Sequence, residues 1–409
     1  MNSIIRLKRT TVLQGTASLL PASKSIANRA LIINALAGNH ATLHNLSDAN
    51  DTQLMLRLVG SPEKTINVED AGTTMRFLTA YFAVAGKNKI LTGTERMMER
   101  PIALLVDALR ELGATINYLG KDGYPPHETL GFAGQRVSTI RIRGDVSSQY
   151  ISALMMIGPL LPQGLTLELT GRIGSRPYID MTAAIMSHFG VPCSMSGNIV
   201  TIPHQPYRAA DFTVESDWSA ASYWFSFASL ATTASISLPR ISLESLQGDS
   251  AVVDIMKSLG VTASMHNGLL NLTKTNKLEE IKWDFTHCPD LAQTIAVVCA
   301  ARGVKGHFTG LESLRIKETD RIAALQNELR KINADLIENS AESWTLIPSE
   351  KLPPTARFAT YKDHRMAMAF APLSAIMDVD IESPAVVRKS YPNFWNDIAS
   401  FGVPVTTEG

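Results

Sequence analysis

The stretch Leu259-Gly260-Val261 carries the pattern that decides the fold: an amphipathic helix ends in a bulky apolar residue, a glycine follows, and a strand-forming residue comes next. Glycine just past a helix adopts the left-handed conformation that caps the last carbonyl groups. The pattern recurs at Leu112-Gly113-Ala114, Phe189-Gly190-Val191 and Phe401-Gly402-Val403, with weaker copies at Ile332-Asn333-Ala334 and Val59-Gly60-Ser61. Intervals of roughly 50–80 residues between these markers predict a repeat architecture.

A second marker stays in step with the first, at the points where apolar helices begin. The expected starts are Ser23-Lys24-Ser25, Ala71-Gly72-Thr73-Thr74, Ser147-Ser148-Gln149, Asp217-Trp218-Ser219, Pro289-Asp290 and Asp363-His364-Arg365. Ser, Thr and Asp accept hydrogen bonds from the free N–H groups of a helix N-terminus. The helices that follow are apolar around most of their circumference, which is typical of buried helices. Each repeat is therefore expected to be an α/β unit with one buried helix, one amphipathic helix and strands between them.

Six such units are expected to form two similar lobes of three. We place the boundary between the third and fourth units near residues 212–216, and a second crossing between lobes at Pro21-Ala22. Loosely spaced helix caps occur in any α/β chain, but two markers in register favour a true repeat.

Composition excludes several classes of protein. In 409 residues, Lys plus Arg and Asp plus Glu each number 38, so the net charge is zero, and no nucleic-acid partner is expected. No apolar run reaches the roughly 20 residues that a membrane span requires, and no signal peptide is visible. Three scattered cysteines are too few for a disulfide framework or a four-ligand zinc site, and free thiols suit a reducing compartment. We therefore expect a cytoplasmic globular protein.

The unusual residues lie where the buried helices begin. A helix N-terminus offers unpaired N–H groups and about half a positive charge, which favours anions. Basic side chains recur at these points, namely Lys24, Arg29, Arg76, His364 and Arg365. One basic residue after a helix cap is usually a solvated surface charge, but recurrence at the same point of a repeat indicates small ligands with phosphates or carboxylates.

Two further clusters could serve the same ligands. In Leu314–Arg321, Lys317 and Arg321 are one helical turn apart, so a helix running to Arg330 would present both on one face beside Glu318. A carboxylate among cations suits acid–base chemistry, although a charged surface helix is the alternative. Arg100 is expected to flank the helix that Pro101 opens, and Arg388-Lys389 is a basic pair or an exposed loop.

Common catalytic motifs are missing from the sequence. It contains no Walker loop, no dinucleotide-binding fingerprint and no Gly-x-Ser-x-Gly nucleophile motif. His287-Cys288 has no partner at the spacing of a metal site or a Cys–His pair, so we interpret both as structural.

The chain resembles the enolpyruvyl transferases over nearly its whole length, and within them the branch that acts on shikimate 3-phosphate. The motifs are Leu20–Leu31, Ala71–Arg76, Glu99–Ile102, Gly123–Pro126, Ser147–Gln149, Pro177–Asp180, Ile316–Arg321 and Asp363–Met368. The resemblance implies two lobes of three α/β units, described as an inside-out α/β barrel, which close around ligand. It places residues 22–213 in the upper lobe and residues 1–21 with 214–409 in the lower lobe.

The resemblance also implies a reaction: the enolpyruvyl group of phosphoenolpyruvate is transferred to the 5-hydroxyl of shikimate 3-phosphate and phosphate is released. This is a step of the shikimate pathway toward chorismate and the aromatic amino acids. Glu318 would give a proton to the methylene carbon and later take it back, Asp290 would hold and deprotonate the hydroxyl, and Lys24 would assist the leaving phosphate. No metal or organic cofactor is implied, the partners are the two small substrates, and the family suggests a monomer.

The binding residues are likewise implied by resemblance. For shikimate 3-phosphate they are Lys24, Ser25, Arg29, Ser147, Ser148, Gln149, Ser175, Tyr178, Asp290, Ser313 and Lys317. For phosphoenolpyruvate they are Lys24, Gly72, Arg100, Gln149, Arg321, Arg365 and Lys389. Asp51 matches a family acid that orients nearby cations.

Several positions depart from the family pattern. Asp70 replaces Asn before Ala-Gly-Thr, and Phe77 replaces Pro. Ala22 replaces Gly, and Ser313 stands where Asn is common. The stretch Gly60–Val68 is short, so the first repeat is expected to be trimmed. These departures leave the reaction intact and bear on affinity and on sensitivity to glyphosate.

Two other functions are open to the same scaffold. The sister branch that acts on UDP-N-acetylglucosamine usually carries a cysteine in its first-lobe loop, and Arg96–Arg100 has none. A non-catalytic anion-binding protein would be expected to lose Lys24, Asp290 or Glu318, and all three are present.

Overall fold

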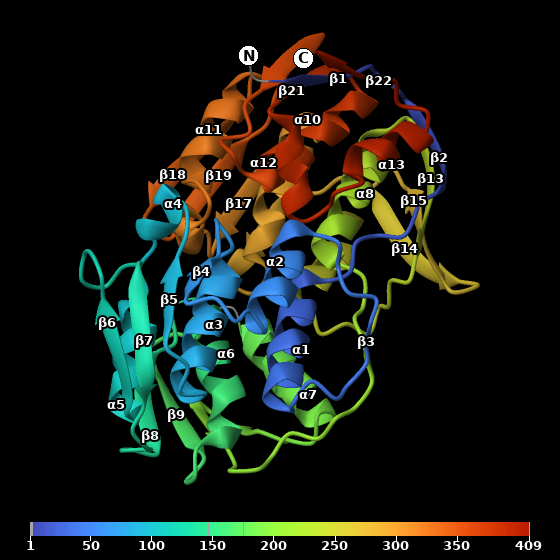
Figure 1. The fold of residues 1–409 in the computed structure, drawn as a ribbon. Helices are drawn as coiled ribbons and strands as arrows, with labels where there is room; N and C mark the ends of the chain where they lie inside the picture. Colours follow the sequence, from blue (N-terminus) through green and yellow to red (C-terminus); the bar gives the residue numbers. More distant parts are fainter. Residues whose placement is uncertain (1–2, 146, 175, 409) are drawn as a thin grey trace. The chain divides into compact units, whose positions relative to one another are not determined.

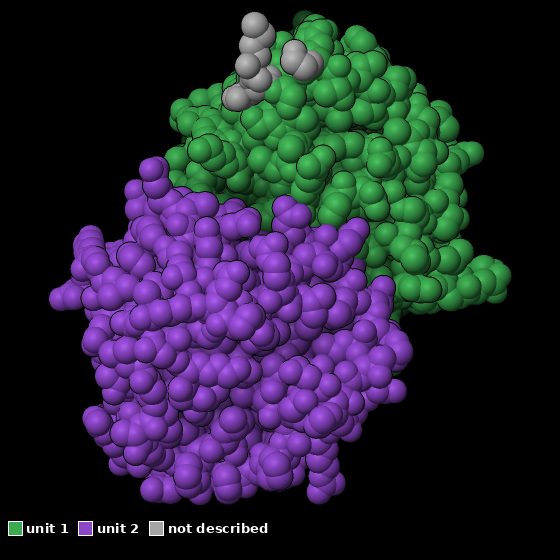
Figure 2. Space-filling view, in the orientation of Figure 1, with its two compact units in different colours: residues 1–21, 215–409 green, residues 22–214 purple. Residues whose placement is uncertain are grey.

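The computed structural model describes residues 3–145, 147–174 and 176–408, which fall into two compact units. Unit 1 is Met1–Pro21 with Glu215–Gly409, and unit 2 is Ala22–Val214 (Figure 2). Each unit has a hydrophobic cluster made only of its own residues. Each unit therefore has a core of its own.

The third repeat of unit 2 shows the plan of the complete repeats. The chain runs through β8 (Thr139–Arg143), α6 (Ser148–Ile157), β9 (Leu165–Thr170), α7 (Arg176–His188), β10 (Ser194–Ser196) and β11 (Ile199–Ile202). The sheet order is β10-β11-β9-β8, with β8 parallel to β9 and the β10–β11 hairpin antiparallel. The buried helix α6 is the crossover between the two parallel strands, as parallel pairing requires.

The second repeat of unit 2 has the same order, and the first is incomplete. The second contains β4 (Thr65–Asn67), α3 (Gly72–Val84), β5 (Lys89–Thr92), α4 (Glu95–Met98), α5 (Ala103–Leu112), β6 (Ala114–Tyr118) and β7 (His127–Phe132). The first contains α1 (Lys24–Leu36), β3 (Leu43–His44), α2 (Asn50–Val59) and β12 (Phe212–Thr213), which pairs in parallel with β3. Residues 60–64 lead from α2 to β4 without a hairpin, so the expected trimming of the first repeat is confirmed.

Unit 1 contains three complete repeats. The first is β2 (Val12–Thr16), α8 (Trp218–Leu230), β13 (Thr233–Pro239), α9 (Val252–Lys257), β14 (Val261–His266) and β15 (Leu269–Lys274). The second is β16 (Ile281–Asp284), α10 (Ala292–Arg302), β17 (Gly306–Thr309), α11 (Arg321–Arg330), β18 (Asp335–Ser340) and β19 (Ser343–Ile347). The third is β20 (Thr355–Phe358), α12 (His364–Phe370), β21 (Asp378–Glu382), α13 (Phe394–Ser400), β22 (Val405–Glu408) and β1 (Ile4–Leu7), which lies between β21 and β22 (Figure 1).

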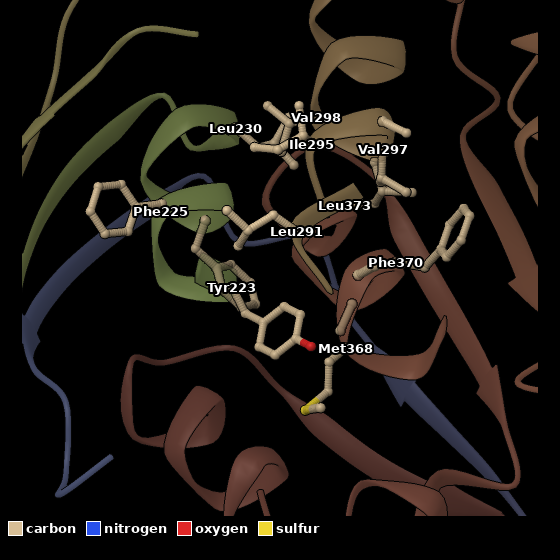
Figure 3. Packing of buried hydrophobic residues seen from close by; sticks show 14 of the residues in the cluster. Tyr223, Phe225, Leu230, Leu291, Ile295, Val297, Val298, Met368, Phe370 and Leu373 are labelled. Atoms are coloured by element: carbon tan, nitrogen blue, oxygen red, sulfur yellow. The ribbon is translucent and has the colours of Figure 1, made fainter. Parts of the chain in front are cut away.

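The buried helices of each unit pack on one another. In unit 1, α8, α10 and α12 are in mutual contact, and Tyr223, Leu291, Ile295 and Met368 lie between them (Figure 3). In unit 2, α1, α3 and α6 do the same. These helices are apolar around their circumference because helices or sheets cover every side.

The predicted repeat and α/β fold class are confirmed, with one correction at a glycine cap. The glycines at 113, 190, 260 and 402 and Asn333 have positive φ, but Gly60 has φ −101° and is no left-handed cap. The described strands form five four-stranded sheets and one two-stranded sheet, and no closed barrel is found among them. Within the described residues, no helix is both long and apolar enough to span a membrane.

Candidate active site

The helix starts in unit 1 lie where the sequence predicted them. Asp217 caps α8 by accepting from the Ala220 N–H at 3.0 Å, and Asp363 caps α12 by accepting from the Arg365 N–H at 2.8 Å. At α10 the start is a short 3₁₀ turn, Pro289–Leu291, that carries Asp290. These caps fix the backbone from which the charged side chains of the site project.

Arg321 is the centre of a charged cluster in unit 1. Its guanidinium is 2% exposed and donates from Nε to Asp363 Oδ2 at 2.7 Å, from Nη1 to Asp290 Oδ1 at 3.1 Å and from Nη2 to Glu318 Oε2 at 2.9 Å. Burial disfavours the charged guanidinium, but the three carboxylates together raise the pKa of Arg321. One cation therefore holds three acids from three separate segments of the chain.

Glu318 contacts two cations, Arg321 and Lys389. Its position before α11 corrects the prediction that Lys317 and Glu318 lie on that helix. Lys389 Nζ lies 3.2 Å from Glu318 Oε1, and Lys389 is buried rather than part of an exposed loop. Lys317 and Glu318 do not lie on α11, because Asp320 caps that helix by accepting from the N–H groups of Ile322 and Ala323, both at 3.1 Å. Glu318 thus reaches Arg321 from the bend at residues 317–319 before the helix.

Arg365 connects Asp290 to a second buried acid. Its Nη2 donates to Asp290 Oδ2 at 2.8 Å and lies 3.4 Å from Ser219 Oγ, which in turn donates to Asp249 Oδ2. Burial and the neighbouring Asp290 raise the pKa of Asp249 to about 7. Burial works against the charge on Arg365, yet Asp290 raises its pKa well above the usual value.

The sequence did not predict a place in the site for Asp363, Asp249 or Ser219. The sequence predicts Asp363 and Ser219 only as parts of helix starts, and that position is the one local signal that points to them. Asp249 lies in the turn Gly248–Ala251 before α9, and nothing in its local sequence shows that it faces Ser219. Contacts over such separations are set by tertiary packing.

In unit 2, Lys24 and Arg29 project from the start of α1. Lys24 Nζ lies 3.3 Å from Asp51 Oδ2, the acid expected to orient cations. Arg29 is 2% exposed and donates to Thr182 Oγ1 at 2.7 Å, the Ser25 carbonyl at 2.8 Å and Ser152 Oγ at 2.9 Å. Burial lowers its pKa to about 10. These partners are neutral hydroxyl and carbonyl oxygens, so they do not neutralise the positive charge of Arg29.

Two aromatic rings flank Arg29. The guanidinium carbon lies 5.4 Å from the ring centre of Phe77 and 5.7 Å from that of Tyr178. Phe77, which departs from the family pattern, therefore contributes a cation–π contact of the kind that stabilises a desolvated guanidinium. Tyr178 also contributes its carbonyl, which accepts from Thr182 Oγ1 at 2.7 Å.

Arg100 lies against the N-terminus of α3. A Cβ placed on Gly72 would come within 2.7 Å of both terminal nitrogens of Arg100. Helix α5 begins at Ala103, so Pro101 precedes it and Arg100 flanks α3 instead of α5, contrary to expectation. Gln149 Nε2 donates to Thr73 Oγ1 at 2.9 Å and so joins the starts of α6 and α3.

The remaining predicted site residues range from buried to exposed. Ser147 caps α6 by accepting from the Gln149 N–H at 3.4 Å, and Ser148 is buried in its first turn. Ser25 is half-buried, Ser313 is exposed, Lys317 is half-buried, and Asp70 lies half-buried just before the start of α3. Ser175 lies outside the described residues.

Neither metal nor thiol chemistry has a candidate site in the described residues. They contain no group of three or more His, Cys, Asp or Glu side chains that could hold a metal ion. Burial raises the pKa of Cys193 and of Cys288 to about 12, and Cys288 accepts from the Trp283 indole N–H at 3.4 Å.

Comparison with known proteins decides the family. The profile of EPSP synthase (3-phosphoshikimate 1-carboxyvinyltransferase) matches residues 7–61 and 58–398. The chain belongs to the EPSP synthase family. Its relatives include a 3-phosphoshikimate 1-carboxyvinyltransferase of Bacteroides fragilis, 48% identical over 95% of this chain and 96% of the relative, and one of Neisseria meningitidis serogroup B, 36% identical over 97% of each.

Solved structures agree with this assignment at the level of the fold. An EPSP synthase from Acinetobacter baumannii is similar over 100% of both chains with a TM-score of 0.79 and 19% sequence identity. The predicted resemblance is thus confirmed, and the repeats of unit 1 and unit 2 are those of the EPSP synthase fold.

Proposed function

We propose that this enzyme transfers the enolpyruvyl group of phosphoenolpyruvate to the 5-hydroxyl of shikimate 3-phosphate, releasing phosphate, and that the two charged clusters described above carry the reaction. The observation that carries the proposal is that one guanidinium, that of Arg321, donates both to Glu318 Oε2 at 2.9 Å and to Asp290 Oδ1 at 3.1 Å. An acid and a base held by one rigid cation have a fixed separation, as a reaction that moves two protons requires.

The balance of charge in unit 1 explains how Glu318 can act as an acid. Three carboxylates, Asp290, Glu318 and Asp363, face three cations, Arg321, Arg365 and Lys389. A phosphoenolpyruvate anion that binds to the cations adds negative charge beside the carboxylates and raises their affinity for protons. Ligand binding therefore favours a protonated Glu318 next to the carbon that must receive the proton.

The steps then follow as addition and elimination. Glu318 protonates the methylene carbon of phosphoenolpyruvate while Asp290 takes the proton of the 5-hydroxyl, whose oxygen bonds to the adjacent carbon. Glu318 then removes a proton from the new methyl group, and the carbon–oxygen bond to phosphate breaks. Lys24, paired with Asp51 in unit 2, supplies positive charge and a proton to the departing phosphate.

Two cations of unit 2, Arg29 and Arg100, add to the substrate binding proposed for the cations of unit 1. Arg29 holds its charge among hydroxyl groups, a carbonyl and two rings, which suits the carboxylate of shikimate 3-phosphate. Arg100 beside the N–H groups of α3 suits a phosphate or carboxylate of phosphoenolpyruvate. We further propose that the enzyme works in the cytoplasm as a monomer and without a cofactor.

Phosphate release in the presence of both substrates tests the proposal. The wild-type chain is expected to turn over, and Glu318→Gln is expected to bind both substrates while kcat falls by about 10²–10⁴-fold. Glu338→Gln, which alters an exposed glutamate paired with Arg315, is the matched control and should retain full activity. Binding without turnover in the wild type would favour an inert anion-binding scaffold, and an unchanged kcat in Glu318→Gln would remove that residue from its role.

A further inference from the structure

The turn between β20 and α12 has an unfavourable backbone conformation. Tyr361 and Lys362 follow one another with φ of 52° and 57°, the left-handed region that L residues with a side chain seldom occupy. Asp363 N–H closes the turn on the Thr360 carbonyl at 2.8 Å. Two consecutive residues of this kind persist only where the surroundings hold them in place.

Helix α11 holds this turn at two points. At its first residue, Arg321 Nε donates to Asp363 Oδ2 at 2.7 Å. Two helical turns later, Glu328 Oε1 accepts from the Tyr361 hydroxyl at 2.7 Å and Oε2 accepts from the Ala359 N–H at 3.0 Å. Both contacts lie on one side of the helix because residues seven apart share a face.

The Glu328 carboxylate is itself well supported. It is 1% exposed, and Lys331 Nζ lies 2.7 Å from Oε2 and also donates to the Arg357 carbonyl at 3.0 Å. A buried carboxylate is retained only when it is paired and hydrogen-bonded, as this one is by a cation, a backbone N–H and a phenol. The backbone N–H, of Ala359, and the phenol, of Tyr361, both belong to the turn that follows β20.

The turn ends at the residues that carry the chemistry. Asp363 is fully buried, accepts from Arg321 and caps α12 through the Arg365 N–H. Arg365 then holds Asp290 at 2.8 Å. Displacement of residues 359–362 would therefore move the guanidinium of Arg365 and the carboxylate of Asp363 together.

We propose that Glu328, acting through Tyr361 and the Ala359 N–H, is a positioning residue that sets Asp363 and Arg365 for phosphoenolpyruvate binding. The inference rests on the proposed function, in which Arg365 binds this substrate. Glu328 lies two helical turns along α11 from Arg321, and its effect passes through the strained turn that it contacts at Ala359 and Tyr361.

Two conservative variants test the proposal. Tyr361→Phe keeps the ring and removes one hydrogen bond, and Glu328→Gln keeps the side-chain shape and removes the charge. Each is expected to raise the KM for phosphoenolpyruvate about three- to tenfold, the loss of one such bond, with kcat changed less than twofold. Asp254→Asn, which alters an exposed acid paired with Lys257 at 2.7 Å, is the control and should leave both constants unchanged.

A rescue separates positioning from general loss of structure. Glycine adopts a positive φ without steric cost, so Lys362→Gly in the Glu328→Gln background should favour the native turn and recover at least half of the lost affinity. In the wild type, the same change at exposed Lys362 should alter KM less than twofold.

The outcomes distinguish this inference from the proposed function. Absence of phosphate release by the wild type would overturn the function. Turnover by the wild type with unchanged KM in Tyr361→Phe would overturn the inference, as would a raised KM that Lys362→Gly does not lower. Tyr361→Phe decides the matter should Glu328→Gln fail to fold.

Discussion

Gly72 shows how a single missing side chain makes room for Arg100 in the proposed phosphoenolpyruvate site. The space that its Cβ would occupy holds the guanidinium of Arg100, which is the flexible end of a long side chain. Gly72→Ala is therefore expected to fold normally and to displace Arg100 from the start of α3. Because hydrogen bonds to charged groups are worth about 1.5–3 kcal/mol, the KM for phosphoenolpyruvate should rise about tenfold or more.

The control for this variant is Gly60→Ala, since a Cβ on Gly60 meets nothing within 4 Å and its φ is negative. Steady-state kinetics with varied phosphoenolpyruvate gives the comparison. Equal KM values for Gly72→Ala and Gly60→Ala would show that Arg100 has no part in binding this substrate.

Asp249 makes the stability of unit 1 depend on pH in an unusual direction. Burial and Asp290 raise its pKa to about 7 in the folded chain, against about 3.9 when unfolded. Between these values the folded state holds a proton that the unfolded state has lost, so the stabilisation present below about pH 4 is lost as pH rises through about 7. The contribution is at most about 1.4 kcal/mol per pH unit over that window. Asp249→Asn should abolish it.

The tryptophans make this measurement specific to one unit. All five, at positions 218, 224, 283, 344 and 395, lie in unit 1. Urea unfolding followed by tryptophan fluorescence at pH 5 and pH 8 therefore reports on unit 1. The free energy of unfolding should fall less from pH 5 to pH 8 in Asp249→Asn than in the wild type. The control Asp254→Asn, which alters an exposed acid, should behave as the wild type does. Identical changes in all three proteins would show that Asp249 does not cause the pH dependence.

At the scale of elements, Asp320 decides where α11 begins. It accepts from two backbone N–H groups of the first turn and leaves Arg321 as the first helical residue. Asp320→Ala should lower the free energy of unfolding of unit 1 by about 1 kcal/mol, the usual value of an N-cap. It should also lower kcat, because Arg321 holds Glu318 and Asp290. Asp320→Ser, which retains a capping oxygen, should recover most of both losses, and a kcat equal to wild type in Asp320→Ala would separate the cap from catalysis.

The same cap shows what sequence could and could not predict. Helix starts and most glycine caps were predicted correctly because they are local: Asp217, Asp363 and Gly260 act on neighbouring backbone groups. The predicted sharing of a helix face by Lys317 and Arg321 was wrong because the Asp320 cap outweighed the helical spacing of charges. The contacts of Asp249 and Glu328 join segments about 30 residues apart, and local patterns carry no information on them.

At the scale of the whole molecule, unit 2 is an insertion into unit 1. The chain leaves unit 1 after Pro21 and returns at Glu215, and the Asp217 N–H donates to the Pro21 carbonyl at 2.9 Å. Within unit 2, the parallel pairing of β12 with β3 joins the last strand to the first repeat. Because the hydrophobic clusters of the two units share no residue, each has the core that independent folding requires.

Residues 22–214 are therefore expected to fold as a separate fragment with cooperative unfolding by far-UV circular dichroism. The fragment contains buried His127, whose pKa burial and Arg76 lower to about 4, with Nε2 2.9 Å from Thr79 Oγ1. Below about pH 6.5 the unfolded chain binds a proton that the folded chain refuses, so the stability of the fragment should fall as pH drops from about 6.5 to about 4. His127→Gln should flatten that dependence. A fragment with no cooperative transition would show that the core of unit 2 needs unit 1 to form.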